Sequence, residues 1–325
     1  MLAFDLFEPY GFQFFQHGII VATIAGALCG LLGVFVVLRG MSYIGHGLSH
    51  AVFGGAAASA VIGINFFIGA GIWGIISGVL IARVARRRVL GADAAIGVVT
   101  TASFALGLAL MNRYGQASKS IEAVLFGSVL GVKVVDIVAV SSVAVFALAV
   151  IVVWYRKLLF STFDPDVAQV SGVNVSVVEV VLLSLLSLTI LVTMRVIGTL
   201  LISALLVIPA ATARMITNSF SRMLMLSPLI GALCCLVGMN LSYHLDTSAG
   251  ATIILVAAAV FTATYLLAGR RARLARGGSA DRAAGIGFPE HPARPAGVLN
   301  GPPARQVSGP RPGAARRRTA SPRCG

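Results

Sequence analysis

The chain has 325 residues, of which 58% are hydrophobic and only 11% are charged, and its formal net charge is +14 at pH 7. A soluble domain carries about 25% charged residues, so this composition excludes an ordinary soluble enzyme or binding domain. Apolar runs of about 20 residues recur along the sequence, and each is long enough to cross a hydrocarbon core of about 30 Å. The sequence therefore predicts an all-α, polytopic transmembrane helical bundle in the cell membrane, in contact with lipid.

We predict nine membrane-spanning helices, with eight or ten as alternatives. The predicted spans are 15–38, 44–62, 66–83, 93–111, 134–155, 175–194, 198–217, 222–241 and 249–268. The apolar stretch "AVLFGSVLGV" (123–132) is too short to span, which favours a re-entrant or interfacial helix. The basic loop "RVARRR" (83–88) belongs in the cytoplasm by the positive-inside rule. With nine spans, this orientation places the N-terminus outside the cell and the C-terminal tail in the cytoplasm.

The second predicted span opens with "GMSYIGHGLSHAVFGG" (40–55), which contains His46 and His50. Side chains four residues apart lie on the same face of a helix, so these two imidazoles can hold one ion between them. Neutral imidazole suits zinc, copper, iron or nickel, and ionisable groups within a span usually face the bundle interior or a water-filled path. The pair therefore indicates a path for a metal cation. The alternative is two interfacial histidines bonded to backbone carbonyls near a helix start.

The sequence contains no energy-converting motif of its own. Its three lysines are Lys119, Lys133 and Lys157, and none follows the glycine of a phosphate-binding loop. Gly47 stands where the zinc-protease motif H-E-x-x-H has its general base, which argues against intramembrane proteolysis. We therefore predict that the chain is not an enzyme. It is either passive or driven by ATP hydrolysis on a separate subunit.

The predicted cytoplasmic loop "FSTFDPDVAQVSGVNVS" (160–176) has the signals of a short capped helix. Asp164 or Asp166 can cap its start, Pro165 fits its first turn, and Gly172 fits its end. Such a helix is suited to docking in a groove of a partner protein. The alternative is a structured loop that has no partner.

A second polar cluster, "SYHLDTSAG" (242–250), lies between the last two predicted spans. His244 and Asp246 could receive a cation on the outer side of the membrane. Alternatively, Asp246, Thr247 or Ser248 is an ordinary N-cap of the helix that follows.

The C-terminal residues 270–325 differ in composition from the rest of the chain. They contain twelve arginines and two acidic residues, a net charge of +10, and eight of the chain's 12 prolines. Such a segment cannot bury a hydrophobic core. We therefore predict a transmembrane domain over residues 1–269 and a disordered, Arg/Pro/Gly-rich cytoplasmic tail over 270–325. No aromatic or fold signal supports nucleic-acid binding.

Six segments together resemble the permease subunit of ABC-type importers for zinc, manganese or iron, and they occur in the order found in that family. They are "VFVVLRGMSYIGHGLSHAVFGG" (34–55), "DAAIGVVTTASFALGLAL" (93–110), "LFGSVLGV" (125–132), "FDPDVAQVSGV" (163–173), "IGTLLISALLVIPAATARMIT" (197–217) and "LSYHLDTSAGATIIL" (241–255). The resemblance covers about residues 15–268 and leaves the tail outside it.

The resemblance implies an ABC importer permease fold and a set of partners. Two copies of the chain would assemble with two ATP-binding cassette ATPase subunits and an extracellular metal-binding protein. The segment 163–173 would be the ATPase-coupling element. Its matching residues are Phe163, Asp164, Pro165, Asp166 and Gly172.

The resemblance also bears on the metal. The family commonly has D-x-x-x-H where this chain has His46 and His50, so His50 carries over and His46 replaces an aspartate. Two nitrogen donors favour zinc over manganese, which prefers carboxylate oxygen. We therefore predict the permease subunit of an ATP-driven divalent metal importer, for zinc, with no permanently bound cofactor. The alternatives are a manganese or iron importer of the same type, a passive channel or secondary carrier, and a non-transporting scaffold.

Overall fold

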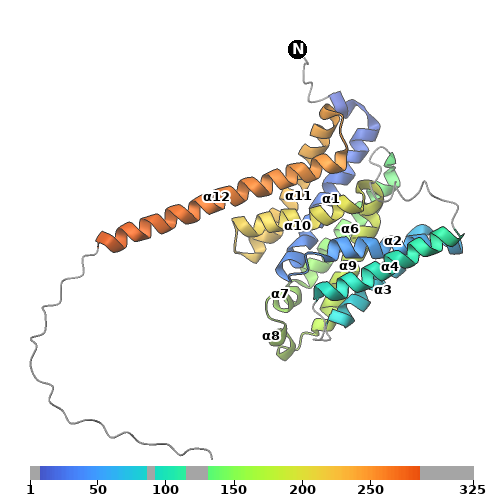
Figure 1. Ribbon diagram of the computed structural model, residues 1–325, viewed down its shortest axis with the longest axis horizontal. Helices are drawn as coiled ribbons and strands as arrows, with labels where there is room; N and C mark the ends of the chain where they lie inside the picture. Colours follow the sequence, from blue (N-terminus) through green and yellow to red (C-terminus); the bar gives the residue numbers. More distant parts are fainter. Residues whose placement is uncertain (1–7, 86–91, 115–130, 286–325) are drawn as a thin grey trace, which may run out of the picture. The chain divides into compact units, whose positions relative to one another are not determined.

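The computed structural model describes residues 8–85, 92–114 and 131–285, and all of the regular elements in these ranges are helices (Figure 1). The elements are η1 (Glu8–Gly11), α1 (Gln13–Leu38), α2 (Ile44–Ile62), α3 (Phe66–Ala85), α4 (Ala92–Tyr114), α6 (Val134–Val153), α7 (Tyr155–Phe163), α8 (Pro165–Val170), α9 (Val175–Ile197), α10 (Thr199–Ile216), α11 (Phe220–Leu245) and α12 (Ala249–Gly285).

Each of the nine predicted spans corresponds to one of these helices. Seven of them, α1, α3, α4, α6, α9, α11 and α12, are long and apolar enough to cross a membrane. Helix α10 is a shorter apolar helix, and α2, which opens with the histidine pair, accounts for the remaining predicted span. The chain is therefore a multi-pass membrane protein, and the predicted all-α transmembrane fold is confirmed.

Helix α1 forms the centre of the bundle. In the most apolar 18-residue stretch of α1, 78% of the residues are buried, whereas the corresponding stretch is 22% buried in α6 and 17% buried in α12. It packs against α11, α10, α6 and α9. Where it crosses α11 the two backbones touch, because a Cβ atom at Gly26 would lie only 2.6 Å from the carbonyl oxygen of Gly231. At the same crossing, the Ser227 hydroxyl donates to the Gly30 carbonyl oxygen over 2.6 Å. Small residues at helix crossings allow such close contact in membranes.

Helices α2, α3 and α4 lie side by side and form a second group, which α9 and α10 join to the rest of the bundle (Figure 1). Helices α2 and α4 approach closely, since a Cβ atom at Gly107 would lie 2.6 Å from the Cα atom of Gly54. The Ser187 hydroxyl of α9 donates to the Gly74 carbonyl oxygen of α3 over 3.0 Å. The first turns of α2 face α4, so the two histidines of α2 lie at the groove between α2 and α4.

Two predictions concern parts of the chain that the structure describes only in part. Helix α12 continues past the predicted domain boundary at Gly269 to Gly285. The predicted disorder of residues 286–325 lies outside the described residues. So does most of the predicted re-entrant or interfacial segment, since residues 115–130 are not described.

Candidate functional site

His46 and His50 are placed by a tight connection between α1 and α2. Helix α1 ends at Leu38, and Gly40, two residues later, has a backbone φ of 67° in the left-handed region that favours glycine. The Gly40 and Met41 amides donate back to the carbonyl oxygens of the last turn of α1, over 3.2 and 3.0 Å. Helix α2 begins at Ile44, so both histidines fall within its first two turns.

The two imidazole rings are in direct contact. Their Nε2 atoms lie 3.2 Å apart, and the ring centroids are 4.5 Å apart in an edge-on arrangement. The ring of Phe104 lies edge-on to His50 at 4.8 Å on the other side. His46 is exposed and His50 is half-buried. The prediction that the pair shares one helix face is therefore confirmed, and the two rings can approach one ion together.

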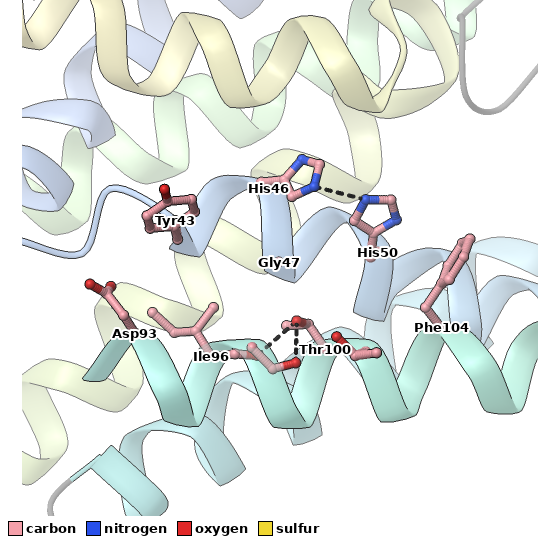
Figure 2. Close-up of a pocket in the computed structure, with 10 residues that line it drawn as sticks. Tyr43, His46, Gly47, His50, Asp93, Ile96, Thr100 and Phe104 are labelled. Carbon is pink, nitrogen blue, oxygen red and sulfur yellow. Dashed lines mark hydrogen bonds between the residues drawn. The ribbon is translucent and has the colours of Figure 1, made fainter. Parts of the chain in front are cut away.

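The pair borders a pocket of about 490 Å³ in the groove between α2 and α4 (Figure 2). The lining residues are Tyr43, His46, Gly47, His50, Asp93, Ile96, Gly97, Thr100, Thr101 and Phe104. Figure 2 shows Asp93 near Tyr43 at one end of this groove and Phe104 beyond His50 at the other. A buried nitrogen of His50, Nδ1, has no hydrogen-bond partner among the described residues.

Asp93 is a pocket residue that the sequence reasoning did not select. It stands in the first turn of α4, and its side chain is exposed. The available signal was its position as the only acidic residue of the segment 93–110, which carries part of the family resemblance. Its place in the pocket depends on how α4 packs against α2, which no local sequence pattern specifies.

The donor set of the pocket suits a transition-metal ion that passes through. Two imidazoles and one carboxylate line the same space, and imidazole binds zinc, copper, iron and nickel well. Within the described residues, no three histidine, cysteine or acidic side chains are grouped closely enough to hold a metal ion together. The arrangement therefore offers a two-nitrogen contact with a carboxylate farther along, which suits transfer of an ion better than permanent storage.

The second predicted cluster does not join this pocket. His244 is in the last turn of α11, with its ring edge-on to Tyr243 at 5.6 Å, and neither His244 nor Asp246 lines the pocket. Asp246 is the C-cap of α11, with a left-handed φ of 51°. Its predicted alternative role as the N-cap of the next helix is therefore not the one it has. A role for His244 and Asp246 in metal binding stays a prediction.

The predicted short helix of the 160–176 loop is present as α8. The Asp164 side chain accepts a hydrogen bond from the Val167 amide over 3.0 Å, and Pro165 is the first helical residue. Of the two aspartates that the sequence allowed as the cap, the structure selects Asp164. At the other end, the Gly172 and Val173 amides donate to carbonyl oxygens of α8 over 3.0 and 2.9 Å. Gly172 has the positive φ, 79°, that this helix ending requires.

Helix α8 has apolar side chains that no described part of the chain covers. Val167 is 50% exposed and Val170 is 92% exposed. At the end of α7, Phe163 is 56% exposed, although its ring lies edge-on to Phe220 at 5.8 Å. The capped ends make α8 a defined helix, and Val167 and Val170, together with Phe163 at the end of α7, form an apolar surface that is available to a partner.

The comparison with known proteins decides the family. The model of the ABC 3 transport family matches residues 11–268. The chain belongs to the ABC 3 transport family. This match confirms the resemblance drawn from the sequence, and it includes both the histidine pocket and α8.

The sequence of this chain matches those of curated relatives over nearly the whole length of each relative. The chain is 35% identical over 275 residues to "Manganese transport system membrane protein MntC" of Halalkalibacterium halodurans, covering 85% of this chain and 94% of the relative. It is 36% identical over 256 residues to "Probable iron transport system membrane protein" of Haemophilus influenzae, covering 79% and 94%. The solved structure "PsaBC from Streptococcus pneumoniae in complex with Fab" matches with a TM-score of 0.73 and 33% identity, covering 82% of this chain and 95% of that one. The ABC importer permease fold is thereby confirmed.

Proposed function

We propose that this chain is the permease subunit of an ATP-driven importer of divalent transition-metal ions. In this proposal the ion passes His46 and His50 as it crosses the membrane. The observation that carries it is the 3.2 Å contact between the two Nε2 atoms at the edge of the pocket between α2 and α4. Paired imidazoles within a span are costly to place there unless they face a path for ions.

The proposed orientation gives the pocket a direction. The basic loop 83–88 precedes α4, and by the positive-inside rule it lies in the cytoplasm. Asp93, in the first turn of α4, is then at the cytoplasmic end of the groove, and Phe104 is toward the outside. An imported ion would pass His50 first, then His46, and then reach the carboxylate of Asp93. A hard oxygen donor at the inner end would receive the ion from the two nitrogens.

The donor atoms of the pocket and the names of the relatives point to different metals. The paired nitrogens favour zinc, as the sequence predicts. The relatives described above are named for manganese and iron, and the carboxylate of Asp93 suits manganese better than nitrogen does. We retain zinc as the expectation from the donor set, and manganese or iron as the alternative that the relatives favour.

We also propose the assembly that this family implies. Two copies of the chain would bind two ATPase subunits on the cytoplasmic side and receive metal from an extracellular binding protein. The exposed apolar surface formed by Phe163 at the end of α7 and by Val167 and Val170 of α8 supports docking of α8 in the ATPase. The N-terminus would lie outside the cell and the C-terminal tail in the cytoplasm.

The test is reconstitution of the complete complex, with its ATPase and its binding protein, in proteoliposomes. We expect ATP-dependent uptake of zinc, manganese or iron(II), and a loss of about tenfold or more in the His50→Ala variant, as for other groups that support a metal ligand set. His17→Ala is the matched control, because His17 is half-buried in α1 and does not line the pocket. No ATP-dependent uptake of any of these metals, or equal uptake by the His50→Ala variant, would contradict the proposal.

A further inference from the structure

On the basis of the transport function proposed above, we propose that Arg39 is a positioning residue that transmits movement of the ATPase-docking helix to the histidine helix. Arg39 is the C-cap residue of α1, and it is far in sequence from both α7 and α8. It joins the two parts of the molecule that the transport cycle has to couple: the α7–α8 arm (155–170) and the start of α2.

The first observation is the bonding of Arg39 to the end of α7. Its Nη2 atom donates to the Ser161 hydroxyl over 2.8 Å, and its Nε atom donates to the Thr162 hydroxyl over 3.2 Å. Both hydroxyl groups in turn donate to the Leu158 carbonyl oxygen, over 3.3 and 2.6 Å. Their hydrogens are therefore occupied within α7, and their oxygens are free to accept from the guanidinium. A planar group with two donors engaged fixes an orientation as well as a distance.

The second observation is that a single residue joins α7 to α8, with no flexible linker between the two helices. Asp164 is at the same time the C-cap of α7 and the N-cap of α8. Its amide donates to the Phe160 carbonyl oxygen over 3.0 Å, while its side chain accepts from the Val167 amide. A force applied to α8 is therefore passed to the last turn of α7, which is the turn that Arg39 holds.

The third observation is that backbone hydrogen bonds also hold the connection between Arg39 and the histidines in a fixed conformation. The Met41 amide donates to the Val36 carbonyl oxygen, and the Ile44 amide donates to the Met41 carbonyl oxygen, each over 3.0 Å. Both Met41 and Ile44 are buried. A shift of Arg39 therefore displaces the first turn of α2, and His46 lies in that turn.

The surroundings of Arg39 explain why a polar bridge has this role. Arg39, Ser161, Thr162 and Glu179 line a pocket of about 450 Å³, together with residues of α8 and α9. Direct apolar packing does not fill this space. The hydrogen bonds of Arg39 lie between groups that line this space, so they can be remade when α7 moves, which a close-packed contact would resist.

The apolar side of α7 offers a competing route. The ring of Phe163 lies against Phe220, and the Phe220 ring also lies 5.7 Å from Phe35 of α1. If this route transmitted the movement, removal of the guanidinium would leave coupling intact. The experiment therefore has to separate the polar bridge from the aromatic contacts and from a simple contribution to folding.

The test uses the complete complex in proteoliposomes and measures metal uptake and ATP hydrolysis in the same samples, with zinc and with manganese. Arg39→Met keeps most of the aliphatic stem and removes every donor. Arg39→Lys keeps the charge with a different geometry, and Ser161→Ala with Thr162→Val removes the acceptors. Arg222→Met is the control, because Arg222 is exposed in the first turn of α11.

We expect Arg39→Met to bind its ATPase and to hydrolyse ATP, while metal uptake per ATP hydrolysed falls by about tenfold, within the range of coupling effects between sites. The Ser161→Ala/Thr162→Val variant should give a similar loss, and combining it with Arg39→Met should add less than the sum of the two losses, because both changes remove the hydrogen bonds between Arg39 and the two hydroxyl groups. Arg39→Lys should be intermediate and the control unchanged. A wild-type ratio in both Arg39→Met and the hydroxyl variant would overturn the inference.

Hydrogen exchange supplies a readout that a purely structural role would not change. In the wild-type complex, we expect nucleotide binding to alter amide exchange both in α8 and in residues 44–50. In Arg39→Met, the change in α8 should remain and the change in 44–50 should disappear. Loss of both changes, or of neither, overturns the inference. If the wild-type complex takes up no metal, the transport function itself fails, whereas normal wild-type uptake with unchanged coupling in the variants removes only the role of Arg39.

Discussion

Gly47 of α2 lies directly against Thr100 of α4: a Cβ atom at Gly47 would be 2.8 Å from the Thr100 Cγ2 atom and 2.7 Å from the Ile96 Cγ2 atom. The Thr100 hydroxyl is already held by the Ile96 carbonyl oxygen over 2.7 Å, so Thr100 is not free to turn away. This contact sets the separation of the two helices at the histidine pocket.

Gly47→Ala should therefore push α2 away from α4. Overpacking of this kind costs about 1–3 kcal/mol of stability, and it should also displace His46 and His50 and reduce metal uptake. Gly97→Ala is the matched control, since a Cβ atom at Gly97 would meet nothing within 4 Å. The apparent melting temperature of the purified protein in detergent is the measurement. Equal melting temperatures for the two variants would show that the pocket tolerates the extra methyl group.

Replacing His46 by aspartate should shift the selectivity from zinc toward manganese. The change restores the residue that the family commonly has and replaces a nitrogen donor by a hard oxygen donor. Its counterpart His50 stays in place, so the pair would become one carboxylate and one imidazole. Competition between zinc and manganese for uptake measures the effect, and we expect a several-fold change in the ratio. An unchanged ratio would show that His46 does not set selectivity.

Asp93→Asn should reduce uptake by about tenfold, in the range expected when a group that supports metal transfer is lost. The amide keeps the size of the side chain and removes the charge that would draw the ion out of the histidine pair. The loss should be larger for manganese than for zinc, because manganese prefers carboxylate oxygen. Asp93→Glu keeps the charge and should recover part of the activity. If Asn and Glu variants transport equally well, the charge has no role.

Asp164→Arg combined with Asp166→Arg should uncouple the transporter. The change removes the hydrogen bond from the Val167 amide and places positive charge at the positive end of α8, at a cost of about 1–2 kcal/mol for the helix. We expect a stable permease that binds its ATPase poorly or fails to support metal-stimulated ATP hydrolysis. Asp164→Asn retains a side chain that can cap and should be nearly normal. Full coupling in the double variant would mean that this segment is only a connector.

The sequence predicted the features that depend on local chemistry. Each of the nine predicted spans became one helix, since the backbone must satisfy its hydrogen bonds internally in lipid, and seven of these helices are long and apolar enough to cross a membrane. The four-residue spacing brought His46 and His50 together, because a helix fixes that spacing within one segment. Asp164, Pro165 and Gly172 marked the ends of α8 for the same reason, as each acts on its own turn of the chain.

The features that the sequence did not predict depend on contacts between distant segments. Asp93 reaches the histidine pocket only because α2 and α4 touch through their glycines. Arg39 meets Ser161 across 122 positions of sequence, and no motif marks either residue as a partner of the other. Asp246 was considered as a cap for the following helix, whereas it ends α11 in the left-handed conformation. In each case tertiary packing, which has no local pattern, decides the outcome.

The contact between Gly54 and Gly107 restricts how the transport path can open. With main-chain atoms of α2 and α4 already touching at that point, the two helices have no side-chain layer over which they can slide or part. They form one rigid unit. In the proposed function, an ion held by His46 and His50 would therefore be released inward as α2 and α4 tilt together against the opposite helices or a second copy of the chain.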